Sequence, residues 1–203
     1  MNILLKLEDI ARKNNLPSIG PIKGQIIKKI ITKHKPKRIL EIGALHGYSA
    51  ILMTNLVLNE IKKNNKNISI ENEILVTIEI DSKLVTIIQK NIKKAGLLDK
   101  IKVLNGDALK IIPKLDKNNK FDLLFLDAEK NQYIKYLKLV EENNLLNKNA
   151  IIIADNVMIY ENEMTDYLDY VRFSGKYESY TTETTLEFTK NVKDALEISL
   201  RKT

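Results

Sequence analysis

The sequence has 203 residues, which is enough for one domain with a substantial core and too few for two ordinary ones. It contains no cysteine, so disulfides and thiolate metal sites are excluded. The amino-terminal segment mixes charged and apolar residues, unlike a signal peptide, and no run approaches the roughly 18 apolar residues that span a bilayer. We therefore expect one domain over residues 1–203, located in the cytoplasm and not in a membrane.

The net charge of +7 is compatible with a nucleic-acid partner and equally with the solvated faces of amphipathic helices. Most of the excess is lysine scattered among isoleucine and asparagine. Arginine, the better reader of bases and phosphates, occurs only at Arg12, Arg38, Arg172 and Arg201. Charge alone therefore selects no partner.

Helical segments and short apolar runs alternate along the chain. Two helices come first, and we expect residues 1–35, which contain them, to cap the functional site. In chain order, helices are predicted at Leu4–Lys13, Pro21–His34, Gly47–Lys62, Ser82–Ala95, Asn131–Asn144 and Asn162–Phe173. Strands are predicted at Arg38–Ile42, Ile74–Ile80, Ile101–Asn105, Asp122–Asp127 and Ala150–Asp155.

The apolar runs are continuous in Ile, Leu and Val, which is typical of parallel strands covered on both faces. Strand–helix repetition of this kind predicts an α/β fold with an open, doubly wound sheet. Near the end, Tyr177–Glu183 and Ala195–Arg201 alternate apolar and polar residues. These two segments predict an antiparallel hairpin at one sheet edge.

The first predicted strand runs into Glu41-Ile42-Gly43-Ala44-Leu45-His46-Gly47. Ligands of open α/β sheets bind at the carboxyl ends of the strands, and the glycines permit a tight turn close to a ligand. Glu41 occupies the position of the first glycine in the dinucleotide-binding motif. A carboxylate there would repel a pyrophosphate but can pair with a cationic amino-acid ligand. An ordinary strand-to-helix turn is the alternative interpretation.

The second and third strands also end in acidic residues. Glu79 is placed to accept the hydroxyls of a ribose, while Asp81, two residues on, is better explained as a helix N-cap. After the third strand, Asp107 in the segment Asn105-Gly106-Asp107-Ala108 is a candidate contact to an adenine amino group. On its own, this segment is only a turn signal.

The fourth and fifth strands place Asp127, Asp155 and Asn156 at two tips that face one crevice. Two carboxylates and an amide oxygen make half of an oxygen shell for a hard divalent cation and leave the other half open. Lys130 follows Asp127 by one turn, within reach of a reacting oxygen. Helix caps at the two aspartates and a turn at Asn156 are the structural alternatives.

Taken together, these residues resemble the cation-dependent O-methyltransferases, the family of caffeoyl-CoA and catechol O-methyltransferases, and most of all its short archaeal-type members. The resemblance covers the chain from about Leu16 onward. It rests on Glu41-Ile42-Gly43…Gly47-Tyr48-Ser49, Glu79, Gly106-Asp107-Ala108, Asp127-Ala128-Glu129-Lys130, Ala154-Asp155-Asn156 and Asp194-Ala195-Leu196-Glu197. It implies a Rossmann-like class I methyltransferase fold, with a mostly parallel seven-stranded sheet, an antiparallel C-terminal hairpin and helices on both faces.

The resemblance also implies site roles and a homodimer. S-adenosylmethionine would be lined by Glu41, Gly43, Ala44, Ser49, Glu79, Ala108 and Asp127. Asp127, Asp155 and Asn156 would hold Mg²⁺ or a similar cation, and Lys130 would be the catalytic base.

Some positions depart from the family pattern. Leu45-His46 replaces small residues, Lys148-Asn149 replaces a glycine pair, and Ile19 replaces a polar cofactor contact. The insertion that shapes the acceptor pocket of the plant enzymes is missing around Met158–Met164. These changes leave the cofactor assignment in place and weaken the acceptor assignment.

The expected reaction is metal-assisted methyl transfer to a small acceptor with vicinal oxygens, such as a catechol, with Lys130 taking the hydroxyl proton. Methylation of a hydroxylated nucleoside in RNA, such as tRNA, is the main alternative, favoured by the lysine excess and the missing insertion. An NAD(P)-dependent oxidoreductase would need a glycine in place of Glu41. A regulatory S-adenosylmethionine-binding domain is the non-enzymatic alternative.

Overall fold

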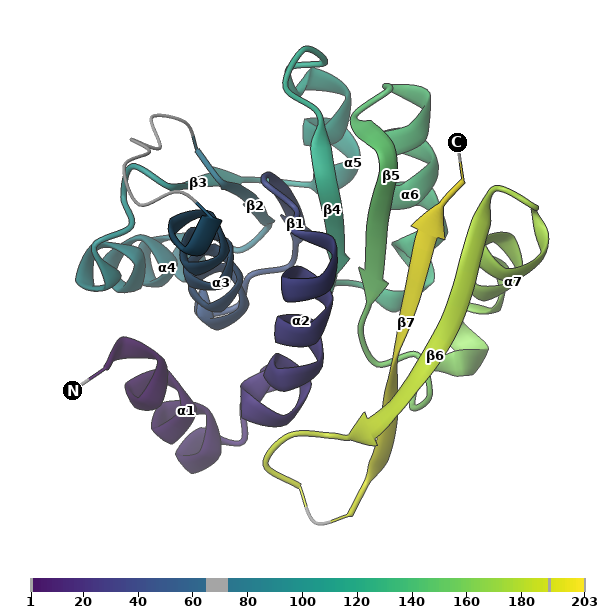
Figure 1. The fold of residues 1–203 in the computed structure, drawn as a ribbon. Coiled ribbons are helices and arrows are strands. Elements are labelled where there is room, and N and C mark those ends of the chain that lie inside the picture. The colour runs from purple at the N-terminus through teal and green to yellow at the C-terminus, as the bar shows by residue number, and fades with distance from the viewer. Residues whose placement is uncertain (1, 65–72, 190, 203) are drawn as a thin grey trace.

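The computed structural model describes residues 2–64, 73–189 and 191–202, and within them the strands form one seven-stranded sheet of order β3-β2-β1-β4-β5-β7-β6 (Figure 1). The strands are β1 Ile39–Ile42, β2 Leu75–Glu79, β3 Ile101–Asn105, β4 Phe121–Leu126, β5 Leu146–Ala154, β6 Tyr177–Thr185 and β7 Lys193–Arg201. Strands β1 to β5 are parallel, and β7 runs antiparallel to both of its neighbours. The α/β sheet with a C-terminal hairpin, as predicted, is confirmed.

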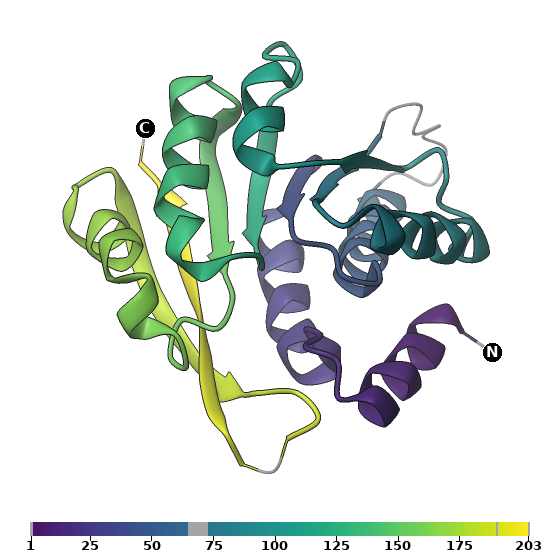
Figure 2. The same cartoon turned by 180° about the vertical axis from the view of Figure 1, so that it is seen from behind.

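Helices cover both faces of the sheet (Figures 1 and 2). One face carries α1 Ile3–Asn14, α2 Gly20–His34, α3 Tyr48–Asn64 and α4 Ser82–Ala95, and the other carries α5 Ala108–Ile111, α6 Tyr133–Glu142 and α7 Thr165–Phe173. Three 3₁₀ turns complete the set: η1 Ile112–Lys114, η2 Lys130–Gln132 and η3 Glu161–Glu163. Each face buries its own apolar cluster, as continuous Ile, Leu and Val strands require.

Local sequence signals explain most element boundaries. Helix α4 begins after Asp81, whose side chain accepts the Lys83 N–H at 2.7 Å, and ends at Gly96 with φ +70°. Strand β5 begins four residues earlier than predicted, at Leu146 rather than Ala150, and its register with β4 shifts. Asn149 has φ +61° there, because asparagine tolerates the left-handed conformation that a glycine would otherwise supply.

Two helices also differ from the sequence-based expectation. Helix α7 begins at Thr165 instead of Asn162, because Glu161–Glu163 form a 3₁₀ turn. The short helix α5 was not predicted, since its four residues are too few to show a helical period.

No helix among the described residues is long and apolar enough to cross a membrane.

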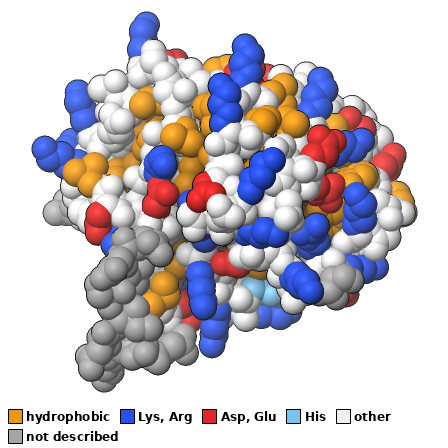
Figure 3. Space-filling view, turned by 90° about the horizontal axis from the view of Figure 1, so that it is seen from above, with side chains coloured by type: hydrophobic (Ala, Val, Ile, Leu, Met, Phe, Trp, Pro, Cys, Tyr) orange, Lys and Arg blue, Asp and Glu red, His pale blue; other side chains and the backbone are white. Residues whose placement is uncertain are grey.

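In Figure 1, β4 and β5 point downward, so Figure 3 views the molecule from the end opposite to their carboxyl ends. On this face, the Lys and Arg side chains are spread among acidic and hydrophobic ones (Figure 3).

The carboxyl ends of β1 and β4 approach each other closely. The Asp127 N–H donates to the Ile42 carbonyl at 3.0 Å, and Gly43, with φ +90°, lies directly against the Asp127 backbone. A Cβ at Gly43 would overlap the Asp127 carbonyl oxygen. Glycine is therefore required here for both its dihedral angle and its size.

We predict that Gly43→Ala lowers the free energy of unfolding by about 3 kcal/mol, while Gly96→Ala lowers it by about 1 kcal/mol. Both glycines have positive φ, but an added Cβ at Gly96 meets nothing within 4 Å. The difference between the variants, measured by urea denaturation, therefore reports the close approach of β1 and β4. Equal losses would show that the approach adds no constraint.

Candidate functional site

Three adjoining pockets lie at the carboxyl ends of the parallel strands, and Asp127 and Pro17 line all three. We call them the loop pocket, beside residues 43–49; the strand-end cleft, along β2, β3 and β4; and the acidic pocket, which contains Asp155 and Asn156. The strand-end cleft has a volume of about 680 Å³, within the usual range of small-molecule sites.

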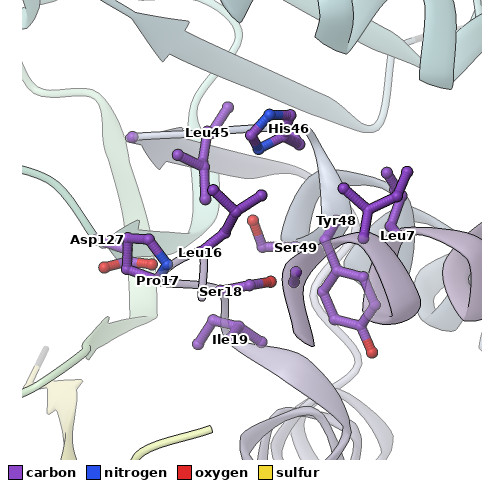
Figure 4. A pocket seen from close by; sticks show the side chains of 14 residues that line it. Leu7, Leu16, Pro17, Ser18, Ile19, Leu45, His46, Tyr48, Ser49 and Asp127 are labelled. Carbon is purple, nitrogen blue, oxygen red and sulfur yellow. The ribbon is translucent and has the colours of Figure 1, made fainter. Parts of the chain in front are cut away.

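The loop pocket lies between the amino-terminal helices and the turn after β1. Figure 4 shows Leu16, Pro17 and Ser18 opposite Leu45 and Ser49, with Asp127 beside Pro17. The Tyr48 hydroxyl hydrogen-bonds to Glu8 at 2.6 Å and ties α3 to α1. The segment 1–35, expected to cap the site, thus contributes lining residues from α1 and from the turn before α2.

Glu79 fixes the turn after β1. Its Oε2 accepts the backbone N–H groups of Ala44 and Leu45 at 3.2 and 3.1 Å, and its Oε1 accepts that of Asp81 at 3.0 Å. These bonds hold Leu45 at φ +49°, an uncommon conformation for a residue other than glycine. Glu79 also lines the strand-end cleft, so the residue that holds the turn borders the cleft as well.

Glu41 is fully buried beneath this turn and lines none of the three pockets. Burial raises the pKa of its carboxyl to about 7, and the charges of Asp127 and Glu79 add to this rise. The hydroxyls of Ser49 and Thr77 act in the opposite direction, although neither makes a hydrogen bond of good geometry to it. Both of its oxygens thus lack a partner within the described residues, which suits a carboxylate awaiting a cationic group.

The other candidate cofactor residues fall in two of the pockets. Ser49 and Ala44 line the loop pocket, Gly43 lines that pocket and the strand-end cleft, and Ala108 lines the cleft alone. Asp107 lines the cleft as well, but its side chain accepts the Leu109 N–H at 2.9 Å and caps α5. The Asp107 side chain therefore has a structural role, as the cap of a short helix.

Asp127, Asp155 and Asn156 line the acidic pocket together. Asp127 follows β4, Asp155 follows β5, and Asn156 has φ +62°. Burial raises the pKa of Asp155 to about 7, and Asp127 contributes to the rise while Lys23 and Lys130 oppose it.

Lys130 lines the strand-end cleft next to Asp127, which borders both that cleft and the acidic pocket. Its Nζ donates to Asp127 Oδ1 at 2.9 Å and to the Tyr133 hydroxyl at 2.8 Å. Its ammonium also lies 5.9 Å from the centre of the Tyr160 ring. Tyr133 is fully buried, so it gives Lys130 a rigid support.

The donor set suits a hard divalent cation. Among the described residues, no group of three or more His, Cys, Asp and Glu side chains has a metal-binding arrangement, so Asn156 would have to supply the third ligand. The Asp127 and Asp155 oxygens that face away from the lysines, and Oδ1 of Asn156, take part in no hydrogen bond in this part of the structure. These three oxygens belong to the ligand types that Mg²⁺ prefers.

Two charged residues that line the acidic pocket were not predicted. Lys23 on α2 is 1% exposed, and its Nζ donates to Asp155 Oδ1 and to Asp194 Oδ2, each at 2.6 Å. A helical period places Lys23 on the buried face of Ile27 and Ile30, a position where a lysine needs a partner, and this signal was available in the sequence.

Glu187 is the second unpredicted residue. It lies between β6 and β7 and accepts the backbone N–H groups of Ile22 and Lys23 at 2.5 and 3.0 Å. The adjacent Phe188 ring lies 5.6 Å from the Arg12 guanidinium. The wall formed by the hairpin is therefore attached to both amino-terminal helices.

Comparisons with known proteins show the family of the chain. A family model described as O-methyltransferase matches residues 1–170. Catechol O-methyltransferase from Bos taurus is 36% identical, over 88% of this chain and 61% of its own length. Catechol O-methyltransferase from Sus scrofa is 33% identical, over 94% of this chain and 96% of its own. The chain thus spans about three-fifths of the bovine relative.

One solved structure shows the same fold. An O-methyltransferase from Bacillus cereus in complex with SAH has a TM-score of 0.80 at 22% identity, over 100% of this chain and 91% of its own.

We predict that Glu41→Gln flattens the pH dependence of stability. A carboxyl whose pKa rises from 4.5 to about 7 on folding stabilises the fold fully below pH 4.5, and this contribution is lost as pH rises through 7. The stability of Glu41→Gln relative to wild type should therefore grow by about 3 kcal/mol across this window. Urea denaturation over the same pH range measures this difference.

Thr54→Val is the matched control, because it removes a buried hydroxyl that has no hydrogen-bond partner and takes no part in setting the pKa of Glu41. Its stability relative to wild type should be the same at every pH. Parallel curves for wild type and Glu41→Gln would show that Glu41 titrates alike in the folded and unfolded protein.

Proposed function

The chain belongs to the O-methyltransferase family, as a cation-dependent member of the catechol and caffeoyl-CoA type, and from this premise we propose that it transfers a methyl group from S-adenosylmethionine to a hydroxyl of a catechol-like acceptor. One observation carries the proposal. Asp127 and Asn156 line both the strand-end cleft and the adjoining acidic pocket, with Lys130 on the side of the cleft and Asp155 on the side of the acidic pocket.

The cofactor would occupy the loop pocket and the strand-end cleft. The bovine and porcine relatives are named as catechol O-methyltransferases, and the Bacillus cereus structure is described in complex with SAH. Glu79 lines the cleft and would offer its carboxylate to the cofactor's ribose. The buried carboxylate of Glu41 lines neither pocket, so its proposed pairing with the cofactor's amino group requires the turn after β1 to move. Ala108 and Asp107 border the adenine end of the cleft.

The cation would be held by Asp127, Asp155 and Asn156. When bound, it supplies Lewis-acid polarisation of the acceptor hydroxyl, which favours loss of the proton. The two aspartates lie on neighbouring strands, and their lysine partners leave one oxygen of each free for the cation. The fixed ends of β4 and β5 set the separation of these ligands.

Lys130 receives the acceptor's proton at Nζ. Its bonds to Asp127 and Tyr133 hold this nitrogen in the strand-end cleft, beside a residue that also lines the acidic pocket. A base fixed by two partners reaches the reacting hydroxyl without searching rotamers. As a neutral amine, Lys130 would accept the proton as the hydroxyl oxygen attacks.

The acceptor would enter the acidic pocket, whose outer wall is largely apolar. Leu16, Ile159, Tyr160, Leu186 and Phe188 line it. Apolar and aromatic walls around a few oxygen ligands suit a flat ring with two neighbouring hydroxyls.

RNA methylation, a homodimer and a cytoplasmic location stay predictions.

We predict that Asp155→Ala separates the two sites. Methyl transfer should fall by at least about 10²-fold because a cation ligand is lost. Affinity for S-adenosylmethionine should stay within about twofold, since Asp155 lines neither the loop pocket nor the strand-end cleft. Calorimetry with the cofactor and a methyl-transfer assay with added Mg²⁺ measure the two quantities. Full activity of Asp155→Ala in the presence of a chelator would overturn metal assistance.

We predict that Lys130→Met lowers kcat by roughly 10²–10⁴-fold and changes the acidic limb of the pH–rate profile. Cofactor and Mg²⁺ binding should survive. Lys135→Met is the control. Lys135 lies in the first turn of α6, is exposed, and lines none of the three pockets. Matching profiles for wild type and Lys130→Met on a catechol acceptor would remove Lys130 from the mechanism.

A further inference from the structure

A buried carboxylate, Asp194, lies behind the acidic pocket without lining it. Asp194 is at the start of β7 and has no exposed surface. The start of β7 and the first turn of α2 both lie near the carboxyl end of β5 (Figure 1). Asp194 therefore touches neither acceptor nor cofactor, and any effect it has on the reaction must pass through its neighbours.

The contact with Asn156 fixes an amide orientation. Nδ2 of Asn156 donates to Asp194 Oδ2 at 2.8 Å. An ionised carboxylate only accepts hydrogen bonds, so the amide must turn its nitrogen toward Asp194. The amide oxygen then points away from Asp194, and Asn156 itself lines the acidic pocket. Without this contact, the side-chain amide has no other fixed partner in the described structure.

Lys23 holds Asp194 in place and extends the network. Its Nζ donates to the same Asp194 oxygen, Oδ2, at 2.6 Å and to Asp155 Oδ1 at 2.6 Å. The Asn156 and Lys23 bonds therefore converge on one oxygen, while the other Asp194 oxygen accepts the Ile159 N–H at 3.5 Å. The side chains of two of the three candidate cation ligands are thus connected to one buried carboxylate.

We propose that Asp194 is a positioning residue, which turns the oxygen of the Asn156 amide toward the cation. The inference rests on the proposed function, because it assumes that Asn156 is a ligand. Groups that orient metal ligands without touching the metal commonly change its affinity by 10–100-fold. If Asp194 had only a structural role, its substitution would change the stability of the fold, and matched variants at this position would bind the cation with equal affinity.

The test compares Asp194→Asn with Asp194→Ala. Both variants remove the same negative charge, so a difference in cation affinity between them does not come from the Coulomb effect of that charge. Asparagine can keep an oxygen at the position where the Asn156 and Lys23 bonds converge, whereas alanine cannot. We expect Mn²⁺, used as the probe and titrated by electron paramagnetic resonance, to bind Asp194→Ala at least about fivefold more weakly than Asp194→Asn.

The same pair is then measured in the Asn156→Ala background. If Asp194 acts through the amide, the difference between the two variants should vanish there. Equal affinities of Asp194→Asn and Asp194→Ala in the wild-type background, or an undiminished difference without the amide, would overturn the inference. Cofactor affinity, measured by calorimetry, should be unchanged in the single variants.

Glu197→Ala controls for damage to the strand. Glu197 is also fully buried on β7 and pairs with Arg172 at 2.8 Å, away from the acidic pocket. It should lower the melting temperature and leave Mn²⁺ affinity unchanged; a loss as large as that of Asp194→Ala would overturn the positioning role. Absence of Mn²⁺ binding in wild type would instead overturn metal assistance itself, and this inference with it.

Discussion

The close approach of β1 and β4 is the constraint on which the site depends. These neighbouring parallel strands are the point where the chain turns from one half of the sheet to the other. The bond from Asp127 to the Ile42 carbonyl and the contact of Gly43 with the Asp127 backbone bring two strand ends to one place. Asp127 consequently borders all three pockets, so cofactor and acceptor would meet at a residue whose backbone is fixed.

Buried carboxylates set the electrostatics of the site. Glu41, Asp155 and Asp194 are all buried, and a buried charge without a partner is strongly unfavourable. Lys23 compensates two of them, and removing one partner of a buried ion pair typically costs about 3–5 kcal/mol. Glu41 has no such cation among the described residues, so its burial raises the pKa of its carboxyl.

The sequence sufficed to predict the fold and the pocket-lining residues at the strand ends. Parallel strands place their carboxyl ends at one edge, so Glu79, Asp127 and Asp155 could be expected there from position alone. The roles of Lys23 and Asp194 could not, because their ion pair joins α2 to a strand that the chain inserts between β5 and β6. Contacts between residues so distant in sequence depend on which elements become neighbours.

The bond between Glu187 and the first turn of α2 joins residues 165 positions apart. Chains are synthesised from the amino terminus, and domains begin to fold as segments emerge. Strands β1 to β4, with the turn that Glu79 holds, are complete long before the hairpin exists. The wall of the acidic pocket, in contrast, forms only when β7 has entered the sheet. The half of the site suited to the cofactor can therefore form before the half suited to the acceptor, which waits for the hairpin.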